Sequence, residues 1–301
     1  MTRSLPAPAS RLMDSNGNLT MLALDQRESL RTMFAGDSPG TSVPDEVLRR
    51  FKADGVATLS PYASAVLLDR LYGVSTTRPA TMAPNCKLIL AADDLHQEPG
   101  QIVSGSSLDE GVTPELVASV GATALKLLVI WRAGESADAR ADLVGRFLEL
   151  CRQTGTVSLV EGIVRPRDGD VWIDQQARHE AIVEAAAELG TSGADVYKAE
   201  VPGYVAGDLS KVEEQSRVVS KILDIPWVVL SNGTQAEEFP EAVRLACRGG
   251  AAGFLAGRAV WADTVREPDP AAALRERSVP RLRRLVQNVA EARRMVATGA
   301  E

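Results

Sequence analysis

The sequence has few of the residues that build metal centres and redox switches. It contains two histidines, His96 and His179, and three scattered cysteines, so clustered imidazole or thiolate ligands are missing. We therefore predict no metal site, and we also expect no other cofactor. Isolated cysteines are typical of a protein kept in a reducing compartment, so we expect three inert thiols and a cytoplasmic location.

Long basic runs and long apolar runs are also missing. The net charge is −7, which argues against nucleic acid or an anionic membrane as the main partner. No apolar stretch approaches the length of a membrane span, and the N-terminus lacks the basic-then-apolar pattern of a signal peptide. The 45% of hydrophobic residues suffices for a sizeable core, so we expect a globular protein.

Short apolar runs alternate with longer helical patterns along the chain. Eight runs are predicted as strands: residues 20–25, 65–69, 87–91, 124–131, 156–161, 193–202, 227–231 and 252–256. Helices are predicted over residues 44–59, 136–153, 174–189, 209–223, 237–248, 258–265 and 270–296, with another from about residue 113. Residues 93–111 are interpreted as a long loop.

This alternation is typical of a parallel sheet closed into a barrel. We predict an α/β protein with a (β/α)8 TIM-barrel fold, one domain over residues 1–301 with an N-terminal extension and C-terminal helices. The alternative is a doubly wound open sheet. That fold would need a glycine-rich turn after its first strand, and residues 25–27 form no such turn.

The predicted strand at residues 193–202 contains a lysine. A period of two places Val196, Lys198 and Glu200 on one face. Burying an ammonium is costly unless it is paired or loses its proton, and an unprotonated amine can attack a carbonyl to form a Schiff base. Alternatively, Lys198 lies on an edge strand, where it discourages aggregation. This strand alone supports the two interpretations equally.

Polar residues gather at the carboxyl ends of the predicted strands, where barrels of this kind carry their chemistry. In chain order they are Asp25, Gln26, Lys126, Glu161, Lys198, Ser231, Asn232, Gly233, Gly257 and Arg258. Each has a simpler explanation by itself, such as a helix cap, a surface residue or a Lys126–Glu161 ion pair. Together they favour an active site.

Two of these groups suggest specific chemistry. The loops after the last two strands usually form the anion site of this barrel, and Arg258 starts a predicted helix there. Its guanidinium suits a bidentate contact with an anion, and the loop at Ser231 adds a hydroxyl and a close backbone approach. A second cation, Lys126, near Lys198 makes it harder for that amine to keep its proton.

These residues lie in segments that resemble a known enzyme family. Residues 22–28, 59–64, 124–128, 164–166, 193–200 and 253–261 are similar to class I, Schiff-base ketose-phosphate aldolases of the tagatose-bisphosphate aldolase group, and within that group to sulfofructosephosphate aldolases. The resemblance implies that Lys198 is the Schiff-base lysine, with Asp25, Lys126 and Glu161 around it. The substrate-binding residues that we expect are Gln26, Arg165, Ser231, Asn232, Gly233, Gly257 and Arg258. Asn232 departs from the family pattern, which has a small residue there.

The reaction implied is a retro-aldol cleavage, with Glu161 as the acid/base and Asp25 as the other candidate. The substrate would be 6-deoxy-6-sulfofructose 1-phosphate, cleaved during sulfoquinovose degradation to dihydroxyacetone phosphate and 3-sulfolactaldehyde. The alternative substrate is tagatose or fructose 1,6-bisphosphate. A sugar-phosphate isomerase or sensor on the same barrel is a further alternative, and neither would form an imine. The expected partner is a sugar phosphate or sulfonate, and we expect a homo-oligomer.

Overall fold

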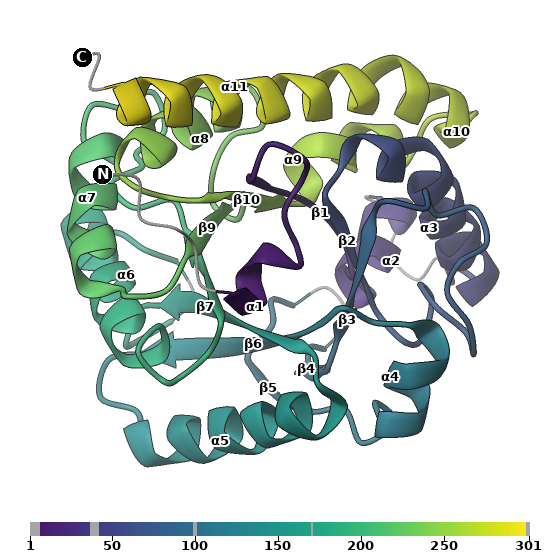
Figure 1. The fold of residues 1–301 in the computed structure, drawn as a ribbon, viewed down its shortest axis with the longest axis horizontal. Coiled ribbons are helices and arrows are strands. Elements are labelled where there is room, and N and C mark those ends of the chain that lie inside the picture. Colours follow the sequence, from purple (N-terminus) through teal and green to yellow (C-terminus); the bar gives the residue numbers. More distant parts are fainter. Residues whose placement is uncertain (1–6, 37–41, 99–100, 170, 299–301) are drawn as a thin grey trace.

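Eight parallel strands close into a barrel in the computed structural model, which describes residues 7–36, 42–98, 101–169 and 171–298 (Figure 1). The barrel strands are β1 (Leu19–Leu24), β2 (Ala65–Leu68), β3 (Lys87–Ala91), β6 (Ala124–Arg132), β7 (Val157–Arg165), β8 (Val196–Glu200), β9 (Trp227–Leu230) and β10 (Gly253–Ala256). Their order is β1-β10-β9-β8-β7-β6-β3-β2, and β1 pairs with both β2 and β10. The predicted (β/α)8 barrel is confirmed, and an open sheet is excluded.

Helices surround the barrel (Figure 1). They are α2 (Glu28–Ala35), α3 (Asp45–Leu59), α4 (Pro114–Val120), α5 (Ala137–Thr154), α6 (Gln175–Leu189), α7 (Val212–Ile222), α8 (Phe239–Arg248), α9 (Arg258–Trp261), α10 (Pro270–Ala273) and α11 (Val279–Thr298). The predicted helix at 270–296 is α10 and α11 joined by one wider helical turn at Leu274–Ser278. Within the described ranges, none of the helices has the length and apolar character needed to cross a membrane.

The strands are buried on both faces, because helices cover the outside and side chains fill the inside. All six residues of β1 and all five of β8 are buried. Met21, Leu159, Val196 and Val228 belong to the interior cluster. Tyr197 belongs to the layer between the strands and the helices. This alternation is the pleat of a strand, and it leaves Lys198 on the interior face with Val196, as predicted.

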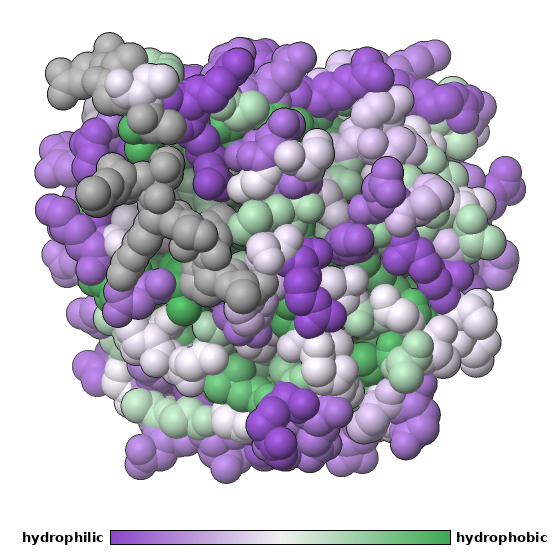
Figure 2. All heavy atoms as spheres, viewed as in Figure 1, coloured by the Kyte–Doolittle hydropathy of each residue, from purple (hydrophilic) through white to green (hydrophobic). Residues whose placement is uncertain are grey.

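The N-terminal segment closes the amino end of the barrel. Helix α1 (Ala7–Ser10) lies across that end in Figure 1. Ala9 and Leu12 have no solvent exposure and belong to the same apolar cluster as the barrel interior. Figure 2 shows this face, where hydrophilic residues dominate the periphery and smaller hydrophobic patches lie between them. Residues 1–6 of the predicted N-terminal extension lie outside the described residues.

Two sequence-based boundaries are wrong. The predicted loop at 93–111 contains an antiparallel hairpin, β4 (Asp93–His96) and β5 (Gly105–Leu108). Its mostly polar residues, with Leu95 and Leu108 as the apolar exceptions, hid the pattern of a strand. The second error concerns Glu161, which lies in the middle of β7 because its ladder with β6 continues to Arg132↔Arg165. Ile163 and Val164 extend the apolar run on the far side of Gly162.

Candidate active site

A cavity of about 360 Å³ opens at the carboxyl end of the barrel, where the sequence predicts the chemistry. It is bounded by the start of α2, the β4–β5 hairpin, and the ends of β6 and β7. Its lining residues are Asp25, Gln26, Ser29, Thr32, Met33, Leu95, Gln97, Gln101, Ile102, Val103, Lys126, Leu128, Ile130, Glu161, Ile163, Arg165, Lys198, Asn232 and Arg258.

Lys198 and Glu161 are direct neighbours in the barrel. They are Cα partners in the β7–β8 ladder, and both side chains point inward. The Lys198 Nζ atom lies 2.8 Å from Glu161 Oε2, and both residues are buried. Because β8 lies between β7 and β9 in a closed barrel, Lys198 is not on an edge strand. The alternative role of this lysine as an edge residue is therefore excluded.

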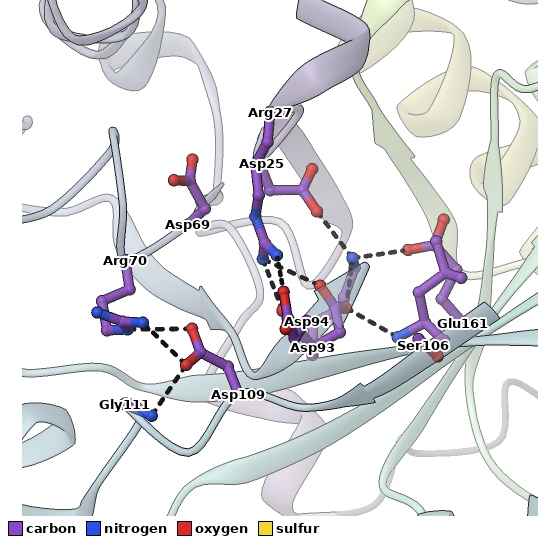
Figure 3. Close-up of polar contacts among 12 residues, drawn as sticks. Asp25, Arg27, Asp69, Arg70, Asp93, Asp94, Ser106, Asp109, Gly111 and Glu161 are labelled. Carbon is purple, nitrogen blue, oxygen red and sulfur yellow. Dashed lines mark hydrogen bonds and ion pairs between the residues drawn. The ribbon is translucent and has the colours of Figure 1, made fainter. Parts of the chain in front are cut away.

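Lys126 is enclosed by three carboxylates. Its Nζ lies 2.7 Å from Asp25 Oδ2, 2.8 Å from Asp93 Oδ2 and 3.4 Å from Glu161 Oε2. Figure 3 shows Asp25, Asp93 and Glu161 converging on this point. Glu161 Oε2 therefore lies between the two lysines, so one carboxylate oxygen is within reach of both amines.

These contacts determine the charge of the network around Lys126. Burial by itself lowers the pKa of Lys126, but the carboxylates of Asp25, Asp93 and Glu161 raise it well above its usual range. Burial by itself raises the pKa of Asp25, while Lys126 and Lys198 lower it well below its usual range. Lys126 thus stays protonated and Asp25 stays ionised at neutral pH.

Asp93 is the main residue of this network that the sequence analysis missed. It is completely buried, and its Oδ2 accepts hydrogen bonds from Lys126 Nζ at 2.8 Å and from the Leu128 backbone N–H at 2.9 Å. Arg27 Nη2 donates to Asp93 Oδ1 at 3.2 Å and to its backbone oxygen at 2.7 Å (Figure 3). The available signal was its position directly after the third apolar strand, the same signal that marks Asp25.

Only part of the predicted anion site lines the cavity. Asn232 and Arg258 line it, and Arg258 Nη2 donates to Asn232 Oδ1 at 2.8 Å. Ser231 and Gly233 flank Asn232 in the turn after β9 but do not line the cavity. Gly257 precedes α9, and an added Cβ there would lie 2.9 Å from Gln26 Nε2. The absent side chain at Gly257 is thus what lets Gln26 approach.

The arginines of the cavity lie on both sides of the lysine strand. Arg165 ends β7, Arg258 follows β10, and β8 with Lys198 lies between β7 and β9. Gln26 also lines the cavity, and its buried Oε1 has no hydrogen-bond partner among the described residues. In the described part of the chain, no group of three or more His, Cys, Asp or Glu residues has the arrangement of a metal site.

The family of this chain follows from its similarity to known protein families. A model of the DeoC/LacD family of aldolases matches residues 19–263, which include all eight barrel strands. The chain belongs to the DeoC/LacD aldolase family. It is a class I aldolase, and therefore a carbon–carbon lyase of carbohydrate metabolism.

Curated relatives of this aldolase agree with the family. The tagatose 1,6-diphosphate aldolase of Listeria monocytogenes is 27% identical over 282 residues, covering 85% of this chain and 80% of its own length. The enzyme of the same name from Streptococcus agalactiae is 26% identical over 294 residues, covering 85% of each chain. Both alignments span most of the barrel, and both proteins are named for a ketose bisphosphate.

Solved structures share the fold of this aldolase. The fructose-bisphosphate aldolase of Plasmodium falciparum superposes with a TM-score of 0.69 at 17% identity, covering 96% of both chains. An archaeal fructose 1,6-bisphosphate aldolase superposes with a TM-score of 0.60 at 18% identity, covering 94% of this chain and 98% of its own. At these identities the superpositions establish the barrel, and the chemistry must be argued from the residues of this chain.

Proposed function

We propose that this aldolase cleaves a six-carbon ketose 1-phosphate through a Schiff base on Lys198. The observation that carries the proposal is the difference between the two buried lysines. Among the ion pairs of the described residues, Lys126 has three carboxylate partners and Lys198 has one, Glu161. An amine held by three carboxylates keeps its proton, whereas Lys198 can pass its proton to Glu161 and attack a carbonyl.

The proposed reaction begins with imine formation. The Lys198 amine adds to the C2 carbonyl, and water leaves to give an iminium. A base removes the C4 hydroxyl proton, the C3–C4 bond breaks, and its electron pair moves into the iminium to form an enamine. The aldehyde leaves, and protonation of the enamine at C3 followed by hydrolysis releases dihydroxyacetone phosphate. We assign the proton transfers to Glu161, because it contacts Lys198 directly while Asp25 stays ionised against Lys126.

The charges of the cavity favour an anion at each end of the substrate. Arg165 and Arg258 lie on opposite sides of β8, so a ketose bound at Lys198 extends toward both. Apart from the buried charges of Asp25, Lys126, Glu161 and Lys198, the other polar lining residues are neutral, among them Gln26, Gln97 and Asn232. A sulfonate carries one negative charge, whereas a phosphate monoester carries nearly two at neutral pH. One arginine on each side of β8 balances the single charge of a sulfonate better than the larger charge of a second phosphate. This supports 6-deoxy-6-sulfofructose 1-phosphate as the substrate, with 3-sulfolactaldehyde as the released aldehyde.

The alternative substrate is tagatose or fructose 1,6-bisphosphate. The names of the curated relatives favour it, since both aligned proteins are called tagatose 1,6-diphosphate aldolases. The same lysine and the same carboxylate would serve either substrate. Both bisphosphates differ from the sulfonate in the group on C6, and hence in the released aldehyde, and the tagatose substrate also differs in configuration at C4.

Borohydride trapping tests the role of Lys198. With dihydroxyacetone phosphate, we expect a stable reduced adduct on the peptide that contains Lys198, and none in Lys198→Met. The matched control is Lys211→Met, an exposed lysine paired only with Glu214 among the described residues, which should trap normally. An adduct confined to Lys126, or no adduct at all, would contradict the proposal, and the latter result would favour an isomerase or a sensor.

A competition assay tests the substrate. The purified enzyme is given 6-deoxy-6-sulfofructose 1-phosphate together with fructose or tagatose 1,6-bisphosphate, and the kcat/KM ratio is measured from the aldehydes released. We expect the sulfonate to be preferred. A higher kcat/KM for a bisphosphate would reject the sulfonate and leave the Schiff-base mechanism standing.

A further inference from the structure

A row of hydrogen bonds connects the barrel interior to the guanidinium of Arg258. It is separate from the contacts among Lys126, Lys198 and their carboxylates. Glu200, the last residue of β8, is 2% exposed and faces inward. Its Oε1 accepts hydrogen bonds from Arg178 Nη2 at 3.2 Å and from Asn232 Nδ2 at 3.0 Å. The other side of the Asn232 amide, Oδ1, accepts from Arg258 Nη2 at 2.8 Å.

The chemistry of donors and acceptors explains why an amide stands at position 232. A carboxylate only accepts hydrogen bonds and a guanidinium only donates them. The Asn232 amide has one end of each kind, so it can join Glu200 to Arg258, and the two neighbours determine its orientation. An aspartate would place a second carboxylate against Glu200, and a serine is too short to reach both groups. A small residue at this position could not make this connection.

Glu200 is held in place from two other directions. Its Oε2 accepts from the backbone N–H of Val164 at 3.0 Å, beyond the last β7–β8 pair at Gly162↔Ala199. Arg178, on α6, is buried beneath the turn that carries Asn232. Gly233 in this turn has a φ of 72°, and an added Cβ would lie 2.6 Å from Arg178 Nη2. Both Glu200 and the turn therefore rest against the same guanidinium.

We propose that Glu200 and Asn232 are positioning residues that aim Arg258 at an anion of the substrate, an inference that rests on the proposed function. Arg258 is exposed at the mouth of the cavity, where a long side chain without a fixed partner would sample several rotamers. The hydrogen bond to Asn232 restricts that freedom before the substrate arrives. It uses one of the five N–H donors of the guanidinium, and the others have no hydrogen-bond partner among the described residues and can face the anion.

A double-mutant cycle tests this role. Asn232→Ala, Arg258→Ala and the double variant are compared on whichever ketose phosphate has the higher kcat/KM. We expect Asn232→Ala to raise KM about tenfold with little change in kcat, because one hydrogen bond to a charged group is lost. In the Arg258→Ala background the same change should have no further effect, since Asn232 acts through Arg258.

The matched control is Asn288→Ala. It removes an amide-to-carbonyl hydrogen bond of 2.7 Å between α11 and Pro240, neither Asn288 nor Pro240 lines the cavity, and KM should not change. Additive losses in the cycle would overturn the proposal, because Asn232 would then contact the substrate itself. An unchanged KM in Asn232→Ala would overturn it as well.

Glu200→Gln extends the test to the buried end of the row. It retains the shape of the side chain but removes the charge, so Val164 N–H and Asn232 Nδ2 cannot both keep an acceptor. We expect Glu200→Gln to raise KM when it is the only substitution. Combined with Asn232→Ala, it should raise KM no further. Thermal unfolding shows whether each variant folds, and an additive effect in a folded protein would exclude Glu200 from the row. If Glu200→Gln does not fold, the cycle of Asn232 and Arg258 decides.

The failure of this proposal can be told apart from a failure of the proposed function. Borohydride trapping with uncharged dihydroxyacetone at high concentration reports on Lys198 without requiring an anion site. An adduct at Lys198 in all variants together with an additive cycle would reject the positioning role alone. No adduct in the unmodified enzyme would reject the Schiff-base function itself.

Discussion

Asp93→Ala is expected to destabilise the protein strongly. The change removes a completely buried carboxylate, and three donors lose an acceptor: Lys126 Nζ, Arg27 Nη2 and the Leu128 N–H. Breaking a buried charge pair typically costs about 3–5 kcal/mol, and an unsatisfied backbone N–H adds about 1 kcal/mol or more. Lys126 keeps Asp25 and Glu161, and Arg27 keeps the backbone oxygen of residue 93, so some compensation remains. We therefore expect a loss of about 3–5 kcal/mol in the free energy of unfolding.

The neighbouring Asp94 provides a matched control. Its side chain is 64% exposed and lies 3.9 Å from Arg27 Nη1, so this pair is a surface ion pair with a contribution of roughly 0–1 kcal/mol. Urea unfolding followed by circular dichroism measures both variants against the unmodified enzyme. Asp93→Ala should lower the urea midpoint clearly, and Asp94→Ala should shift it little.

A small effect would refute the reasoning. If Asp93→Ala lost less than about 1 kcal/mol, the network around Lys126 would be no stronger than a surface pair. If Asp93→Ala and Asp94→Ala lost equal amounts, burial would not explain the effect. If the unfolding slope also changed, the comparison would have to use a second probe, because the two-state assumption would fail.

Four further results are expected. Arg258→Ala should lower kcat/KM by about tenfold or more. Arg258→Lys should retain only part of the kcat/KM of the unmodified enzyme, because lysine lacks the planar fork of a guanidinium. Full activity in the alanine variant would place Arg258 outside the site. Activity should survive EDTA, since we predict no metal, and a loss restored by zinc would contradict this. Burial raises the pKa of Cys86, Cys151 and Cys247 to about 12 each, so iodoacetamide at pH 8 should label these thiols only after unfolding. The stability that these neutral thiols contribute is complete below about pH 9, the pKa of the thiols in the unfolded chain, and is lost as the pH rises toward 12. Urea midpoints that did not fall over this pH range would contradict the prediction.

Much of the fold could be predicted because parallel barrel strands are buried on both faces. Such strands appear as continuous apolar runs, and all eight runs in the sequence became barrel strands. The β4–β5 hairpin escaped prediction because it lies outside the barrel, where Asp94, His96 and Ser106 alternate with few apolar residues. Helix α2 was missed for a related reason, since Leu30 is its only fully buried residue.

The sequence by itself predicted several of the groups at the cavity end of the barrel, although it placed Glu161 at a strand end and missed Asp93. The period of a strand set Lys198 and Glu200 on one face, and the barrel rule set Asp25, Lys126 and Arg258 at one end. These conclusions need only local geometry and the closure of the sheet. They hold because neighbouring parallel strands present their ends on the same side.

Only the tertiary structure decided which of these groups touch. The β7–β8 register places Glu161 beside Lys198, and the hairpin brings Asp93 to Lys126 across 33 residues of sequence. The connection of Glu200 through Asn232 to Arg258 depends on a turn resting on a buried arginine from another helix. Such contacts span elements that are distant in the chain, and differences of a few tenths of an ångström decide whether a hydrogen bond forms. Residue spacing along the sequence carries no information at that precision.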